Sequence, residues 1–240
     1  MLTATLFVCV MASGEAYGKL KPLKAGKWVK IFDGKTYDGW RGYNKTEVPL
    51  KWIVEDGAMK ITTTGRREGT EGGGDIIYTT KLHNFILELE WKVSEVEANS
   101  GLFYYAEEIP GEPIYVSAPE YQIVGNVPGG NPKHQSASLY DLLPAEPQNG
   151  SPIGKWNKAR IVVNNGRIEH WQNGVKVVEY TLWTPEWKAL LDASKFSERR
   201  WPLAYQHLIN IGGPDREGYI GIQDHGDHAW YRKVRVKVLE

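Results

Sequence analysis

Apolar and polar residues alternate along much of the chain in short segments that are separated by Gly, Asn, Asp and Pro. The clearest case is the segment 85–93, where apolar residues at the odd positions alternate with Ile86, Glu88, Glu90 and Lys92. A period of two places one set of side chains in a core and the other set in water. The segment 85–93 is therefore predicted to be a β-strand with one buried face.

Three further segments follow one another with hairpin turns between them. They cover residues 160–163, 168–172 and 175–180, and the connections contain Asn165-Gly166 and Asn173-Gly174. Asn-Gly accepts the positive φ angles that two-residue hairpin turns require, so these segments predict a three-stranded meander. The segments 218–224 and 230–239 predict two more strands.

Helical periodicity is scarce, and the best candidate is the segment from Thr184 to Phe196. Thr184 is a suitable N-cap, Pro185 suits the first helical position, and Glu186 falls in the first turn. No repeat or linker divides the chain. We therefore predict an all-β protein with a single domain over residues 27–240, a two-sheet antiparallel jelly-roll sandwich with one short helix.

The first residues have the character of an export signal. An apolar run at 2–12 is followed by small residues, which predicts a signal peptide over residues 1–18 and a periplasmic or extracellular protein. The run is too short to span a bilayer as a helix, and no later segment is a candidate. Cys9, the only cysteine, lies within the run, so the processed chain would have no thiol chemistry.

Charge and aromatic content narrow the class of partner. Lys plus Arg and Asp plus Glu both total 29, so no net charge attracts nucleic acid. Ten Trp and thirteen Tyr against five Phe favour rings that carry a polar edge. Such rings suit the mixed apolar and hydroxylated faces of sugars, and they equally suit a sandwich core.

Four places carry candidate chemistry. Asn99 precedes a glycine that would admit a ligand close to the backbone, although a plain turn has the same sequence. Glu120 and Gln122 share one face of a strand, which is costly in a core and favourable in a wet cleft or on an exposed face. The other two places are the loop with His134, Tyr140 and Asp141, and the segment of Asp224, His225, Asp227 and His228.

The last segment offers ligands for a divalent metal or an acid–base pair. Four such residues within five positions cannot converge from an extended strand, so at most two are expected to act. No zinc, phosphate-loop, nucleophile-elbow or dinucleotide motif is present, so no nucleotide cofactor is expected.

A set of longer segments resembles a known family. The segments WVKIFDGKTYDGWRGY, GGGDIIYT, FILELEWKVSEVEANSGLFY, PEYQIV, LYDLL, KWNKARIVVNNGRIEHWQNGVKVVEY and GYIGIQDHGDHAWYRKVRVK occur in the order found in the 3-keto-disaccharide hydrolase-like family. The chain resembles that family over nearly everything after Ala25. The resemblance implies a concanavalin A-like lectin/glucanase sandwich, and an exported enzyme that cleaves glycosides oxidised to a ketone at C3.

The implied chemistry begins at the proton on C2, which the C3 carbonyl acidifies. A base removes it, the C1 substituent is eliminated and water adds, giving net hydrolysis. The resemblance implies His134 or Glu120 as base, with Glu120, Asp224 and His225 shared between acid and metal roles. A divalent cation would act as a Lewis acid on the enolate oxygen.

The substrate-binding residues expected on this basis are Asn99, Gln122, Tyr140, Asp141, Arg160 and Trp171. Arg160 has the alternative of facing solvent, and Trp171 that of lying in the core. Two other functions stay open: a non-catalytic carbohydrate-binding module, and a classical glycosidase with carboxyl groups about 5–5.5 or 6.5–9.5 Å apart. The sugar and the oligomeric state are left undetermined.

Overall fold

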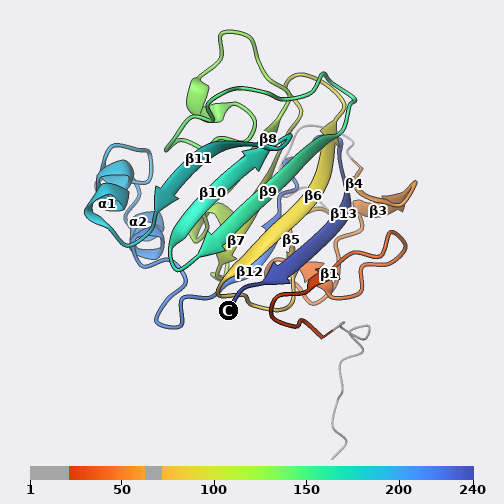
Figure 1. Cartoon of the computed structure of the whole chain (residues 1–240), viewed down its shortest axis with the longest axis horizontal. Helices are drawn as coiled ribbons and strands as arrows, with labels where there is room; N and C mark the ends of the chain where they lie inside the picture. The colour runs from red at the N-terminus through yellow and green to blue at the C-terminus, as the bar shows by residue number, and fades with distance from the viewer. Residues whose placement is uncertain (1–21, 63–71) are drawn as a thin grey trace, which may run out of the picture.

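The computed structural model describes residues 22–62 and 72–240. Two antiparallel sheets pack face to face and enclose one main core, which confirms the predicted sandwich (Figure 1). The predicted signal peptide and most of the arginine- and glycine-containing stretch at 62–75 lie outside the described residues. Within those residues, no helix has the length and the apolar character needed to cross a bilayer.

The larger sheet has eight strands and faces the viewer in Figure 1. Its members are β1 (Trp28–Lys30), β3 (Trp52–Glu55), β4 (Ala58–Ile61), β6 (Phe85–Val93), β9 (Asn157–Asn164), β10 (Arg167–Gln172), β11 (Val175–Thr181) and β13 (Ala229–Val238). They lie in the order β11-β10-β9-β6-β13-β4-β3, and β1 also pairs with β13.

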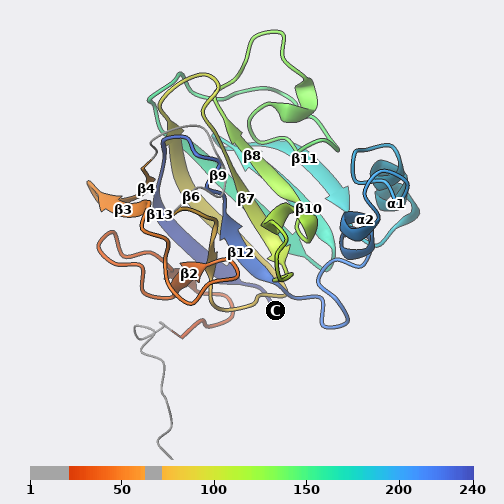
Figure 2. The ribbon, with the colours of Figure 1, turned by 180° about the vertical axis from the view of Figure 1, so that it is seen from behind.

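The smaller sheet has five strands and is nearer the viewer in Figure 2. Its members are β2 (Trp40–Gly42), β5 (Ile76–Tyr78), β7 (Asn99–Ala106), β8 (Glu120–Val124) and β12 (Tyr219–Ile222), in the order β2-β5-β12-β7-β8. The outer face of this sheet is bordered by long connections, one of which carries the 3₁₀ turn η1 (Ile114–Val116). The loop after β8 contains a second such turn, η2 (Pro132–His134).

The predicted periodicities explain the strands that form. In β6, Leu87 and Leu89 are buried between the sheets, while Glu88 and Glu90 lie on the solvent side. The meander β9-β10-β11 is confirmed, and its two Asn-Gly turns have positive φ at both residues. Local sequence therefore determines both the strands and their hairpin register.

Over the described parts of the chain there are two short α-helices where one was expected. The predicted one is α1 (Pro185–Asp192), in which the Thr184 hydroxyl caps the Trp187 amide as expected. The second is α2 (Pro202–Ile209), whose N-cap residue makes no side-chain hydrogen bond. Its sequence offers Pro202 at the first helical position but no polar cap, and its formation depends on burial of one apolar side.

Candidate functional site

The floor of the candidate site is the outer face of the five-stranded sheet. Gln122 on β8 pairs with Gly101 on β7, and the amide of Gln223, just after β12, donates to the carbonyl of Gly101. Paired residues of neighbouring strands project to the same face, so these three form one row. Glu120 lies two residues before Gln122 and therefore shares that face. The predicted proximity of Glu120 and Gln122 is confirmed by this register.

Gly101 leaves the space that the Glu120 side chain occupies. A Cβ atom on Gly101 would lie 2.3 Å from Oε1 of Glu120 and 2.8 Å from its Cδ. The carboxylate of Glu120 therefore lies flat over β7, close to the row that carries both glutamines. Glu120 is 8% exposed, so this carboxylate is almost removed from bulk water although it lies on the outer face of the sheet.

Two amide oxygens on this floor have no hydrogen-bond partner. They are Oε1 of Gln122, which is 2% exposed, and Oε1 of Gln223, which is 4% exposed. Nε2 of Gln122 donates to Oδ1 of Asn99 at 3.1 Å, which orients that amide. A buried unpaired acceptor costs about 1–3 kcal/mol. Each of the two oxygens therefore has an acceptor capacity that the described protein groups leave unused.

The sequence patterns did not single out Gln223, although it lies within the predicted strand 218–224. Its pairing across β7 with Gln122 depends on the strand order of the sheet. The signal that could have found it is the isolated amide that ends an otherwise apolar and glycine-containing segment.

One wall of the site is the loop after β8. The amide of Tyr140 donates to the carbonyl of Glu120 at 3.1 Å, so Tyr140 extends the sheet beside the carboxylate. The ring of His134 stacks on Tyr140 with centroids 4.6 Å apart. Nε2 of His134 lies 3.3 Å from Oδ1 of Asp141, and the other oxygen of Asp141 accepts from the amide of Lys195. The predicted residues of this loop therefore come together beside Glu120.

The surroundings of Tyr140 favour the neutral form of its hydroxyl. Burial raises the pKa of its hydroxyl, and the nearby carboxylates of Glu120 and Asp141 raise it further. Nζ of Lys195 lies 4.3 Å from the centre of the Tyr140 ring and brings a positive charge to this wall. Lys195 was not predicted from the sequence, because it follows α1 and only the tertiary fold brings it to the loop.

A buried histidine holds the loop from inside the sandwich. Nδ1 of His170 donates to the carbonyl of Ala137 at 2.9 Å, and its Nε2 accepts from the hydroxyl of Tyr104 at 2.7 Å. Full burial lowers the pKa of His170 to about 4. His170 is therefore neutral at physiological pH, and it anchors the segment between Gln122 and Tyr140.

Asp224 and His225 do not form the expected metal set with Glu120. The oxygens of Asp224 accept from the amides of Gly74 at 2.8 Å and Gly226 at 3.0 Å, so this carboxylate holds two turns together. Nδ1 of His225 lies 3.7 Å from the carboxylate of Asp227 on a partly exposed loop. Over residues 22–62 and 72–240, no group of three or more His, Cys, Asp or Glu side chains is arranged to hold a metal ion.

Arg160 and Trp171 lie away from the other predicted residues. They pair with each other on β9 and β10, and Arg160 pairs with Glu88 of β6 on the solvent face of the eight-stranded sheet. The expectation that both line a cleft with Glu120 does not hold, because the sandwich core separates the two outer faces. Arg160 follows the alternative of a solvent-facing strand residue.

Comparison with known proteins relates the chain to one family. The sequence model of the 3-keto-alpha-glucoside-1,2-lyase-like domain matches residues 27–237. A protein of Bacteroides thetaiotaomicron named 3-keto-disaccharide hydrolase is 51% identical over 235 residues, which cover 91% of this chain and 81% of that protein.

Solved structures agree with the fold. A crystal structure from Parabacteroides distasonis, provisionally assigned as a glycosyl hydrolase, superposes with a TM-score of 0.73 at 25% identity, covering 89% of this chain and 94% of the other. The exoplasmic domain of VIP36, in a form bound to Ca²⁺ and Man3GlcNAc, gives a TM-score of 0.51 at 11% identity, covering 92% and 91% of the two chains. This second likeness concerns the lectin-like sandwich alone.

Proposed function

The chain belongs to the 3-keto-alpha-glucoside-1,2-lyase-like family and is a glycoside-hydrolase-like enzyme that acts on carbohydrate. From that premise, we propose that it cleaves 3-keto-glycosides by elimination and water addition, with Glu120 as the base. The observation that carries the proposal is the Glu120 carboxylate, which lies over Gly101 on the floor of the site beside two buried unpartnered amide oxygens.

The first step of the proposed reaction is removal of the C2 proton by the carboxylate of Glu120. The electron pair forms an enediolate with the C3 carbonyl, and its collapse to an enone breaks the bond between C1 and the leaving oxygen. Glu120 is preferred to His134 as base because it lies on the floor, whereas His134 stacks on the outer loop with its side chain 38% exposed. General bases act by direct contact with the proton they remove.

Tyr140 supplies the proton that the leaving oxygen needs. Its hydroxyl is protonated at neutral pH, as that of an ordinary tyrosine is, and its position next to Glu120 places acid and base on one side of the sugar. The positive charge of Lys195 on this wall favours the negative charge that develops during elimination. Water then adds to C1 of the enone and gives its proton to the Tyr140 phenolate, while Glu120 returns its proton to C2. Both residues regain their starting state, and the net change is hydrolysis.

The unpartnered oxygens of Gln122 and Gln223 bind sugar hydroxyls in this proposal. A ketone cannot donate a hydrogen bond, so these acceptors recognise the hydroxyls that flank the C3 carbonyl and not the carbonyl itself. Leaving either acceptor unsatisfied is costly, so the pair discriminates against ligands without hydroxyls in reach.

The test compares a 3-keto-glucoside that carries a chromogenic leaving group with its unoxidised parent. The wild-type chain is expected to cleave only the keto substrate, and Glu120→Gln is expected to lower the rate by about 10²–10⁴-fold. Glu198→Gln, a change of the same kind at an exposed position, is the control and is expected to keep the rate. If neither glycoside is cleaved while sugar still binds, the proposed reaction is refuted in favour of a binding module.

The same assay with a chelator examines metal participation. Retention of the rate is expected if Glu120 and Tyr140 carry the reaction with the protein's own groups. Loss of the rate, restored by one divalent cation, would contradict this assignment and return a Lewis acid to the mechanism.

A further inference from the structure

The solvent face of the eight-stranded sheet carries a continuous row of charged and aromatic side chains. The register pairs Trp171 with Arg160, Arg160 with Glu88, Glu88 with Arg235, and Arg235 with Lys30, so the row crosses β10, β9, β6, β13 and β1. In Figure 1 no described helix or loop crosses the front of these strands. This face is therefore open to a ligand, and it lies on the opposite side of the core from Glu120.

A groove of about 650 Å³ follows this row. Its charged lining consists of five cationic side chains and two carboxylates, Glu88 and Glu90. The cationic residues are Lys30, Lys158, Arg160, Lys233 and Arg235. The chain as a whole has no net charge, but this groove has more cationic than anionic side chains. The net charge of the chain therefore gives no sign of this local positive charge.

Both carboxylates of the groove are already bound by cations. Glu88 accepts from Nε of Arg160 at 2.7 Å and from Nε of Arg235 at 2.8 Å. Glu90 accepts from Arg232 at 2.7 Å and Lys233 at 2.8 Å. These pairs hold the long side chains in fixed positions, which lowers the entropy cost of binding a further anion.

Two groove lysines are available for such an anion. Lys30 and Lys158 are exposed, and the described residues give neither of them a salt-bridge partner. They stand on β1 and β9, on either side of the Glu88 and Glu90 pairs. An anionic ligand that follows the groove would therefore meet a cation on each side of β6 and β13.

Trp171 adds an aromatic surface at the end of the row. Its indole nitrogen donates to Glu169 at 2.7 Å, which fixes the ring, and the Arg160 guanidinium lies 6.0 Å from the ring centre. The guanidinium therefore lies over one face of the ring at the outer limit of a cation–π contact, and Trp171 keeps part of its surface exposed. Partly exposed, fixed indoles suit the apolar face of a sugar ring.

We propose that this groove binds an acidic saccharide chain whose rings carry carboxylates, as uronic acids do. The carboxylates would pair with Lys30, Lys158 and the free nitrogens of the two arginines, while one ring would stack on Trp171. A neutral glycan would satisfy only Trp171, and an anion without apolar faces only the cations. This binding site is separate from the proposed catalytic site and does not depend on it.

The experiment measures binding of polygalacturonate to the full chain by isothermal titration calorimetry, at low and at high ionic strength, with a neutral glucan for comparison. We expect binding of the acidic chain only, and weaker binding at high salt because exposed charges are screened. The double variant Lys30→Glu/Lys158→Glu is expected to bind at least about tenfold more weakly. Trp171→Ala is expected to weaken binding at both ionic strengths.

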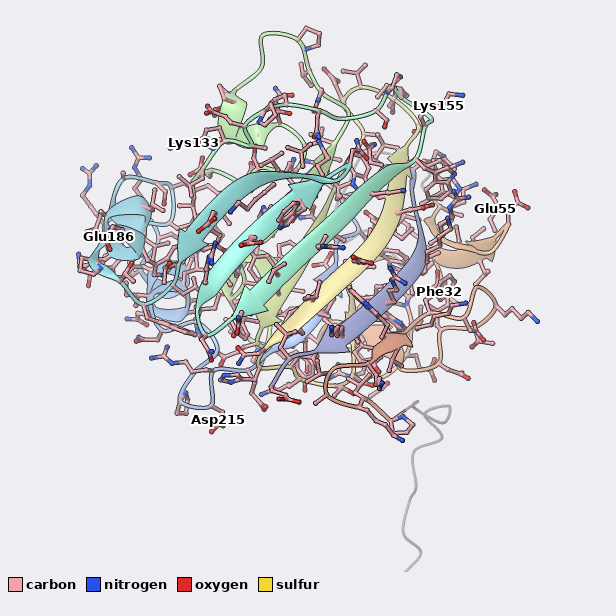
Figure 3. All side chains as sticks on the ribbon, viewed as in Figure 1. Phe32, Glu55, Lys133, Lys155, Glu186 and Asp215 are labelled. Carbon is pink, nitrogen blue, oxygen red and sulfur yellow. The ribbon has the colours of Figure 1, made fainter. Side chains whose placement is uncertain are left out.

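The matched control is Lys35→Glu/Lys155→Glu, which changes the net charge equally at two exposed lysines outside the groove; Lys155 is labelled at the periphery in Figure 3. This control is expected to bind as the wild type does. No binding by the wild type, equal binding of the glucan, or equal loss in both double variants would overturn the proposal. Cleavage of a small 3-keto-glucoside is expected to be unchanged in the groove variants, since Glu120 lies on the other sheet.

Discussion

Replacement of Gly101 by Ala is the sharpest perturbation of the candidate site, because it adds one methyl group beneath the Glu120 carboxylate. The new Cβ would lie 2.3 Å from Oε1, 2.8 Å from Cδ and 2.9 Å from Cγ of Glu120. Ordinary contact begins near 3.4 Å, so the carboxylate must move by about 1 Å or more. Gly101 has no positive φ, so the backbone itself accepts alanine.

The expected cost follows from the displacement. A base displaced by about 1 Å from its reacting proton loses about 10²-fold in rate, which corresponds to about 2.7 kcal/mol of transition-state stabilisation. The assay is kcat/KM on a chromogenic 3-keto-glucoside, together with the thermal midpoint of unfolding. We expect the rate to fall while the midpoint changes little.

A double-mutant cycle separates this clash from other effects of the methyl group. In a Glu120→Ala background there is no carboxylate to displace, so Gly101→Ala is expected to leave the residual rate unchanged. The reasoning is refuted if Gly101→Ala keeps the wild-type rate, or if it costs as much without Glu120 as with it.

Three further predictions test other parts of the site. Gln223→Leu is expected to lower kcat/KM about tenfold while raising the free energy of unfolding, because it removes a buried acceptor that only a ligand satisfies. A fall in both kcat/KM and the free energy of unfolding would contradict the assigned role. Tyr140→Phe is expected to slow cleavage of a glycoside with an alkyl leaving group more than that of one with a nitrophenyl group, which leaves without a proton. An equal decrease in rate for both substrates would show that Tyr140 is not the acid. The pKa of His170 is about 4 in the folded chain and about 6.5 in the unfolded chain, so the unfolded chain binds the proton first. The free energy of unfolding is therefore expected to fall as the pH drops from about 6.5 towards 4, by about 3 kcal/mol at most. The His170→Gln variant is expected to be less stable at neutral pH, but its free energy of unfolding should fall less over that pH interval. The measurement is urea unfolding at several pH values. An equal change of the free energy of unfolding with pH in both proteins would disprove the assignment.

Local patterns in the sequence predicted most of the fold. The alternation at 85–93 and the Asn-Gly turns at 165–166 and 173–174 are confirmed as β6 and the β9-β10-β11 meander. Helix α2 was missed because it forms without a polar cap and depends on the surface against which it packs. Period and turn chemistry are local properties, so they could be read before any tertiary contact was known.

The site was predicted only where its residues share a strand or a loop. Glu120 and Gln122 are two residues apart on β8, so the sequence alone placed them on one face. The same alternation predicts the side of its strand from which Arg160 projects, but it does not predict which sheet that strand joins. Only the strand order places Arg160 on the side opposite Glu120. Gln223, Gly101 and Lys195 entered the site through pairing and packing between distant segments.

The sequence by itself determined the strands, their turns and the two-residue spacing of Glu120 and Gln122, because side-chain direction along a strand is set by neighbouring residues. Only the tertiary structure decided which sheet each strand joins, and hence that Gly101 makes room for the Glu120 carboxylate. The strand order also brings cationic side chains of β1, β9 and β13 into one groove of a chain with no net charge. Strand order depends on burial summed over the whole core, and no short segment contains that information.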